Sequence, residues 1–153
     1  MQLIRTALND AVTNCDFLLE GRNQVTTPPI GTEIKLYSDH YSNCHERFQP
    51  GDHVKLYALS YDPTKNVTTS APLAVALEAS GEYYFWPSWT HDFDSSIINL
   101  VPEQPTSIEI LNFQWPDTGT ATESGLKFYS ALLSDDQSSV RGHFDMVAFE
   151  FGP

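Results

Sequence analysis

The segment Leu73–Trp89 constrains the fold more than any other part of the chain, because it carries two apolar runs separated by a tight turn. Pro72–Ala79 and Glu82–Trp86 are rich in apolar and aromatic residues, which favour strands. Between them, Ser80-Gly81 is a two-residue connection of the kind that joins antiparallel strands. The segment therefore predicts a β-hairpin that ends in a dense aromatic block.

Strand-like runs recur along the rest of the chain, separated by turn-forming segments rich in Pro, Gly and Asp. In Val54–Leu59 and Phe144–Phe151 apolar residues return near every second position, as expected for strands with one buried and one wetter face. The predicted strands are Glu33–Ser38, His53–Tyr61, Pro72–Ala79, Glu82–Trp86, Ser107–Trp115, Leu126–Leu133 and Phe144–Phe151. This pattern predicts an all-β fold, a two-sheet antiparallel β-sandwich of about seven strands.

Residues 1–24 differ in character and are interpreted as an N-terminal extension or the end of a preceding segment, with 25–153 forming the sandwich domain. The extension contains an apolar stripe at helical spacing, formed by Leu3, Ile4, Ala7, Leu8, Ala11 and Val12. Pro28-Pro29 makes a stiff connector, either a surface loop of one domain or a boundary. The predicted core comprises Val54, Leu56, Val75, Leu77, Phe85, Ile110, Phe128, Leu132, Val147 and Phe149.

The charge balance restricts the partners that this chain can take. It has 20 Asp and Glu against 8 Lys and Arg, a formal net charge of −12, and no cluster of basic residues. Nucleic-acid binding needs cations to neutralise phosphates, so we expect no nucleic-acid partner. No apolar run approaches the length of a membrane-spanning helix, so no membrane insertion is expected either. The acidity then serves solubility or divalent cations.

The aromatic block and the loop after it are the one localised candidate for a binding site. Its predicted residues are Tyr84, Trp86, Trp89, Asp92 and Asp94. Trp89 follows a proline that leads the chain out of the strand, so it is the ring expected to be exposed. Rings there supply contact area for sugars or for protein subunits, and the two carboxylates accept hydrogen bonds or ligate Ca²⁺. The alternatives are core packing for the rings and a solvated loop for the acids, so no cofactor is expected outright.

A second group of polar residues has weak zinc-ligand character. His40, Cys44 and His45 lie close together in the sequence, and Cys15 is the remaining thiol. A structural zinc site usually has four such ligands, and the alternative is an ordinary polar loop. Cys15 and Cys44 either form a disulfide or remain two separate thiols, and we expect no catalytic role for them.

The order of these elements resembles immunoglobulin-like β-sandwich accessory modules of bacterial secreted or surface proteins. The resemblance covers Ile30 to Phe151. It rests on Phe48-Gln-Pro-Gly-Asp before an alternating strand, Leu73-Ala-Val-Ala-Leu leading through Gly81 into the aromatic strand, Gly125-Leu-Lys-Phe-Tyr-Ser-Ala-Leu-Leu, and the closing Phe144-Asp-Met-Val-Ala-Phe-Glu-Phe. It implies an extracellular or cell-surface module that spaces, adheres or binds and is not an enzyme.

Three functional hypotheses follow. The leading one is a non-catalytic module for adhesion, spacing or assembly, with protein subunits or neighbouring domains as partners. The second is a carbohydrate-binding module that uses the loop from Trp86 to Asp94 to hold glycans. The third is a small metal-dependent or acid–base hydrolase, although the sequence has no nucleophile elbow, phosphate-binding glycine loop or H-E-x-x-H pair.

Overall fold

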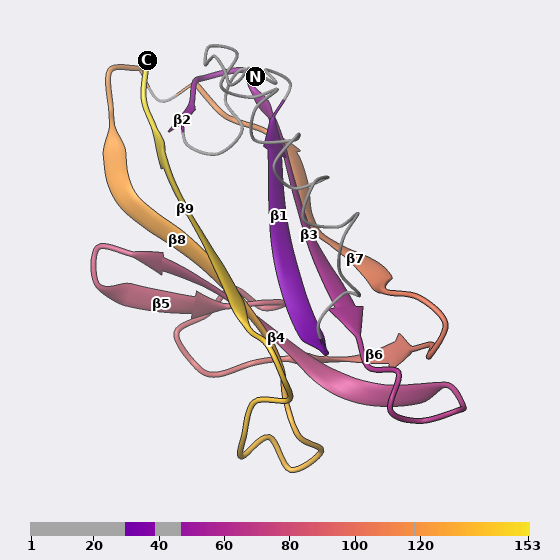
Figure 1. The fold of residues 1–153 in the computed structure, drawn as a ribbon. Coiled ribbons are helices and arrows are strands. Elements are labelled where there is room, and N and C mark those ends of the chain that lie inside the picture. Colours follow the sequence, from indigo (N-terminus) through magenta and orange to yellow (C-terminus); the bar gives the residue numbers. More distant parts are fainter. Residues whose placement is uncertain (1–29, 39–46, 118) are drawn as a thin grey trace, which may run out of the picture.

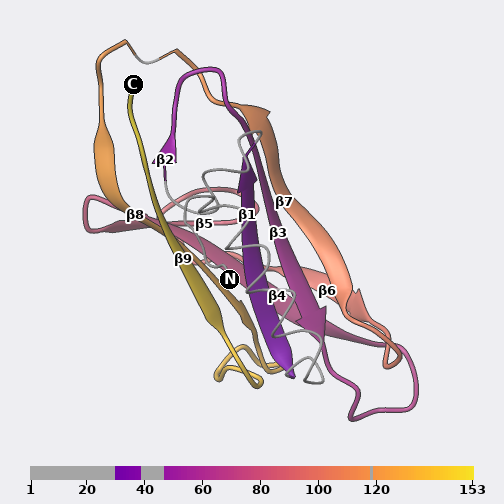
Figure 2. The same ribbon diagram turned by 45° about the horizontal axis from the view of Figure 1, so that its top comes forward.

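The computed structural model describes residues 30–38, 47–117 and 119–153, which form two sheets packed face to face (Figure 1). The smaller sheet has the order β1-β3-β7, with bounds Gly31–Ser38, His53–Tyr61 and Thr106–Gln114. The larger sheet has the order β2-β9-β8-β4-β5, with bounds Arg47–Phe48, Asp145–Phe151, Glu123–Leu132, Thr69–Ala79 and Glu82–Phe85, and β6 (Ser96–Leu100) also pairs with β4. Figures 1 and 2 show the two sheets close together at one end and diverging toward the end that carries β2.

This arrangement confirms the predicted all-β, two-sheet sandwich. All strand pairs are antiparallel except the short β2–β9 pair, which is parallel. The described residues contain two strands that the sequence pattern did not predict, β2 and β6. The N-terminal apolar stripe at helical spacing lies outside the described residues. Among the residues described, no helix has the length and apolar character needed to cross a membrane.

The predicted hairpin is present. Ala79 and Glu82 are register partners, so Ser80 and Gly81 form a two-residue loop between β4 and β5. Both loop residues have positive φ, 54° and 79°, which is the backbone of a type I′ turn and favours glycine at the second position. The other half of β4, Thr69–Leu73, pairs with β6 along the same edge.

The core lies between the two sheets and contains most of the residues predicted for it. Seven of the ten are buried, namely Val54, Leu56, Val75, Ile110, Phe128, Leu132 and Phe149. Leu77, Phe85 and Val147 are half-buried instead. Phe85 lies on the outer side of its strand, because it is the register partner of Ala76 and alternates with the inward Tyr84. Further buried residues of the core, which were not among the ten, are Ile34, Leu36, Phe48, Ala58, Ala71, Leu73, Ile98, Leu100 and Leu126.

The first described strand is joined to the last one across the sandwich. Gly31 forms a parallel bridge with His143, the Thr32 N–H donates to the His143 carbonyl at 2.9 Å, and the His143 N–H donates to the Ile30 carbonyl at 2.6 Å. The Ile34 N–H donates to the Asp145 carboxylate at 3.0 Å. These bonds connect β1 of the smaller sheet to the start of β9 in the larger one.

A buried ion pair fixes the loop between β8 and β9. Asp62 is 6% exposed, and its carboxylate accepts hydrogen bonds from the Thr64 N–H at 3.0 Å, from the Thr64 hydroxyl at 2.6 Å and from the Arg141 guanidinium. Burial raises the pKa of Asp62, but the bonds from Thr64 and Arg141 together outweigh it and hold the pKa below its ordinary value. The carboxylate is therefore charged at neutral pH.

Candidate functional site

The structure does not bring the five predicted site residues onto one surface. Tyr84 lies on the inner side of β5, as the register partner of Leu77, and its ring contacts His91 with a centroid distance of 4.5 Å. Trp86 is half-buried and packs against the core cluster. Asp92 is exposed in the loop after β5. Tyr84 and Trp89 come together in the lining of one space between the sheets, whereas Asp92 lies outside it.

Trp89 is half-buried, so the prediction that it is the exposed ring is wrong. The Trp89 N–H donates to the Phe85 carbonyl at 2.6 Å, and φ at Trp89 is 55°. This turn folds the chain back after Pro87 and brings the indole edge-on to Phe128, with ring centroids 6.3 Å apart. The ring therefore contributes to the inner wall of the sandwich.

Asp94 is engaged within its own loop. Its carboxylate accepts hydrogen bonds from the Ser88 N–H at 3.2 Å and the Ser95 N–H at 2.9 Å. Hydrogen bonding from Ser88, followed by that from Ser95, lowers the pKa of Asp94. In the described ranges, no group of three or more His, Cys, Asp or Glu residues is placed to hold a metal ion. The candidate zinc and disulfide residues His40, Cys44, His45 and Cys15 lie outside those ranges.

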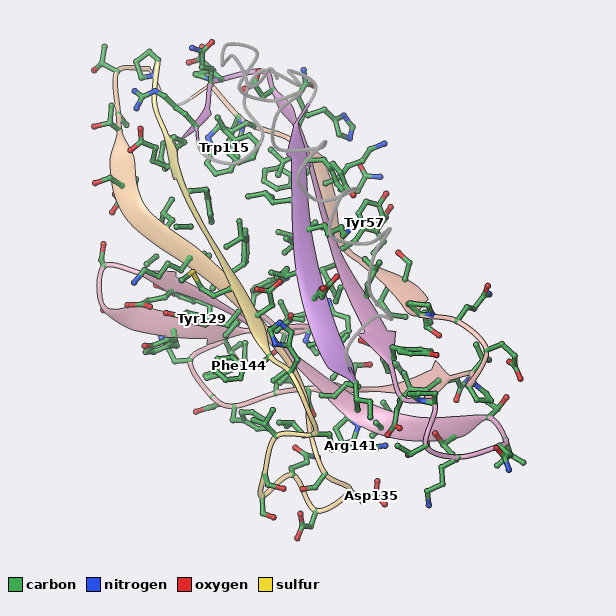
Figure 3. The ribbon with its side chains drawn as sticks, viewed as in Figure 1. Tyr57, Trp115, Tyr129, Asp135, Arg141 and Phe144 are labelled. Atoms are coloured by element: carbon green, nitrogen blue, oxygen red, sulfur yellow. The ribbon has the colours of Figure 1, made fainter. Side chains whose placement is uncertain are left out.

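The two outer faces of the sandwich differ in composition. The outer face of the smaller sheet mixes tyrosines, such as Tyr37 and Tyr57, with the polar residues Lys35, Lys55, Glu109, Asn112 and Gln114. The outer face of the larger sheet is rich in alanine and aromatic residues, and we name it the apolar face. Its residues are Ala74, Ala76, Tyr83, Phe85, Phe93, Tyr129, Ala131, Phe144, Met146 and Ala148. Figure 3 shows Tyr129 beside β8 and Phe144 near the start of β9.

Strand register assembles a continuous apolar row across this face. Ala76 pairs with Phe85 on one side and Tyr129 on the other, and Tyr129 pairs with Met146. Phe93 extends the row, because its ring lies 5.4 Å from that of Phe85. Met146 is 45% exposed and Phe93 54%, so the row is open to solvent at both ends. Large apolar side chains gathered in this way commonly mark interaction surfaces.

The neighbouring row carries the face's charged pair. Glu78 and Lys127 are register partners on β4 and β8, with Tyr83 opposite Glu78 on β5. The Tyr129 hydroxyl donates to Glu78 Oε1 at 2.6 Å. That hydrogen bond, assisted by burial and by the charge of Glu78, raises the pKa of Tyr129 to about 12. Tyr129 is therefore a neutral hydrogen-bond donor. Glu78 and Lys127 carry opposite charges, so this pair adds no net charge to the face.

The sequence carries a signal for the apolar face. In β8 and β9, apolar side chains occur in both alternating phases: Phe128 and Phe149 point inward, whereas Tyr129, Met146 and Ala148 point outward. Strands that are apolar in both phases are typical of sheets covered on both sides. The second phase therefore predicts that something covers this face.

On the inner side, the diverging sheets leave a second candidate site, which we name the inter-sheet cleft. Its volume is about 670 Å³, within the range of small-molecule sites. It opens between the β4–β5 hairpin and β7. Its lining comprises Val54, Leu77, Ala79, Ser80, Glu82, Tyr84, Trp89, Leu111, Phe113, Trp115, Glu123, Leu126, Phe128, Phe149 and Phe151.

Comparison with known proteins gives only remote similarities. No family model matches the chain, and no curated protein matches it. The CARDB domain of the PF1109 protein from Pyrococcus furiosus, solved in complex with di-metal ions, is similar at a TM-score of 0.37 and 10% identity, over 84% of this chain and 100% of that chain. The sporulation control protein Spo0M from Bacillus subtilis is similar at a TM-score of 0.33 and 9% identity, over 78% of this chain and 49% of that chain. Similarity at this level carries no functional argument.

Proposed function

We propose that this chain is a non-catalytic β-sandwich module that acts by protein association through its apolar face. The observation that carries the proposal is the contrast between the two outer faces: on one, lysine, glutamate and amide side chains stand among the tyrosines, while the other exposes Tyr83, Phe93, Phe144 and Met146 by 45% to 59%. Exposed apolar area of this kind costs free energy in water, and burial against a partner recovers it. Aromatic residues and Met are also enriched in protein interfaces.

The strand order supports an immunoglobulin-like assignment within this proposal. The smaller sheet, β1-β3-β7, corresponds to strands A-B-E of such a sandwich, and β9-β8-β4 of the larger sheet corresponds to G-F-C. β5 and β6 then occupy the edge beyond strand C. Modules with this architecture are frequent in cell-surface proteins, so we propose an extracellular or cell-surface setting for the chain.

The occupant that we propose for the apolar face is a second copy of the chain. With strands about 4.8 Å apart and a rise of about 3.3 Å per residue, β9, β8, β4 and β5 present a face of roughly 20 Å by 20 Å. Two such faces remove on the order of 1,000 Å² from water, which is at the lower limit for a specific interface. Glu78 and Lys127 balance each other there, so face-to-face contact brings no net charge together.

The remainder of the chain makes the association salt-dependent in a defined direction. Each copy carries a formal net charge of −12, and the two copies repel each other at long range. Added salt screens this repulsion while leaving apolar burial intact. The dimer is therefore expected to tighten as ionic strength rises, the opposite of an association driven by complementary charges.

Sedimentation equilibrium over a range of protein concentrations tests the proposal. The wild type should dimerise, and Met146→Lys should shift it to monomer because the new charge lies inside the contact. Val67→Lys, at a residue that is 65% exposed in a loop away from the face, is the matched control and should dimerise normally.

Three outcomes would overturn the proposal: a wild type that is monomeric at every concentration, a Met146→Lys variant that dimerises as well as Val67→Lys, or a dimer that weakens with added salt. Retention of the monomer on a polysaccharide column, abolished by Tyr129→Ala, would assign the face to glycans instead.

A further inference from the structure

We infer that the inter-sheet cleft binds a small amphipathic molecule with a flat apolar body and a cationic end. The inference does not depend on the proposed function, because the cleft lies on the other side of the larger sheet. Along β5 the two surfaces alternate: Glu82 and Tyr84 line the cleft, whereas Tyr83 and Phe85 belong to the apolar face.

The shape of the cleft follows from a local irregularity in β7. The register of β7 against β3 shifts at Leu56/Tyr57, where Ile110 is passed over between Glu109 and Leu111. After this bulge, Leu111 pairs with the buried Leu56 and Phe113 with the buried Val54, so both side chains face inward. A bulge re-aims the side chains that follow it, and here they form one wall of the cleft.

The opposite wall and floor are aromatic and held in place by ring contacts. Phe128 and Phe149 stack with centroids 4.9 Å apart and planes at 9°, and Trp89 meets Phe128 edge-on. Trp115 contacts Phe151 at a centroid distance of 4.8 Å. Sandwich interiors normally interdigitate without large voids, so 670 Å³ of aromatic-lined space leaves apolar surface in water. A flat ring system would cover that surface.

The polar groups at the mouth determine the charge of the ligand. Glu123, half-buried at the start of β8, accepts a hydrogen bond from the Ser80 hydroxyl at 3.2 Å. Glu82 lies 3.2 Å from the ring nitrogen of His91. Both carboxylates line the cleft, while Lys and Arg are absent from its lining. Together with the net charge of −12, this arrangement attracts a cation and repels an anion of the same shape.

Isothermal titration calorimetry with two matched probes tests the inference. 1-Naphthylmethylamine and 1-naphthoate share a flat apolar body and differ in the sign of the charge. The amine should bind at one site per chain, and at low salt at least fivefold more tightly than the naphthoate. Equal affinities, tighter naphthoate binding or no binding of the amine would overturn the inference.

Variants locate the binding. Ala79→Trp places a large ring inside the cleft and should abolish amine binding, whereas Ala148→Trp, the same change on the apolar face, should leave it unaltered. Circular dichroism verifies that both variants are folded. If Ala79→Trp does not fold, Leu111→Lys replaces it as the test variant. A cation on the cleft wall should exclude the amine by repulsion.

Charge variants test the mouth. Glu82→Gln and Glu123→Gln should each weaken amine binding about two- to fivefold while the naphthoate gains, as expected for partly exposed charges. Glu103→Gln, an exposed acid outside the cleft, is the control and should have no effect. Loss of binding in Ala148→Trp, or equal effects of all three glutamine variants, would assign the probe to another surface.

Discussion

Replacing Phe128 by alanine should remove about 4 kcal/mol from the free energy of unfolding, because the ring is deeply buried and contacts two other aromatic rings. Phe128 is 4% exposed, so truncation gives up most of the ring's transfer from water. It also removes the stacking contact with Phe149 and the edge contact with Trp89, worth about 0.5–1.5 kcal/mol each beyond burial. The void left behind merges with the inter-sheet cleft, so the surrounding strands cannot easily close over it.

Urea denaturation followed by tryptophan fluorescence measures this loss as a lower midpoint at an unchanged slope. The matched control is Phe144→Ala, the same chemical change at a ring that is 59% exposed. At concentrations where the chain is monomeric, the control should change the free energy of unfolding by less than about 0.5 kcal/mol. If Phe128→Ala lies within about 1 kcal/mol of the parent, or if the two variants lose equal stability, the account of the core around β8 is refuted.

Four further predictions concern the ion pair of Asp62 with Arg141, the hydrogen bond of Tyr129 to Glu78 and the close approach of Gly142 to the Ile30 backbone. Arg141→Met should cost about 2–3 kcal/mol in a urea melt, since it leaves the buried carboxylate of Asp62 without its cation, and an unchanged midpoint would contradict this. The depressed pKa of Asp62 contributes stability above its ordinary value of 3.8 and loses it as the pH falls through the lower folded value, so Asp62→Asn should flatten the acid limb of the stability curve. Absorbance titration should show Tyr129 ionising near pH 12 in the folded protein and nearer its ordinary value in Glu78→Gln. Gly142→Ala should destabilise by more than about 1 kcal/mol, because a Cβ there would lie 2.2 Å from a backbone oxygen and φ is +73°; native-like melting would disprove that contact.

The fold could be predicted largely from local patterns. Period-two alternation in residues 53–61 identifies β3, and the Ser80-Gly81 turn places β4 beside β5. Both signals act between near neighbours in the sequence, where turn chemistry and pleat determine the outcome. β6 was not predicted, because the adjacent Ile97 and Ile98 interrupt the alternation of apolar and polar residues. In the structure Ile97 is 62% exposed and Ile98 is 7% exposed. β2 is two residues long and held only by distant β9.

The candidate sites were harder to predict, because they depend on contacts between distant strands. The return of Trp89 onto Phe128 depends on a backbone bond within the loop after β5 and on a strand almost 40 residues further along. The apolar row needs the register of four strands, which no single segment specifies. The inter-sheet cleft arises from the bulge at Ile110 and the divergence of the sheets, and neither has a local signature.

The bonds that residues 143–151 make with β1 and β2 have a consequence for how this protein folds. β2 pairs with β9, and Gly31 at the start of β1 bridges to His143, so these contacts form only after the far end of the chain has found its place. Bringing such distant segments together costs conformational entropy and slows folding. Topologies rich in distant pairings typically fold in milliseconds to seconds. Until β9 docks, the edge of β8 stays unpaired beside an apolar face and can pair with another chain. The yield of folded protein should therefore fall as protein concentration rises, and a chaperone that binds this edge for a time should raise it.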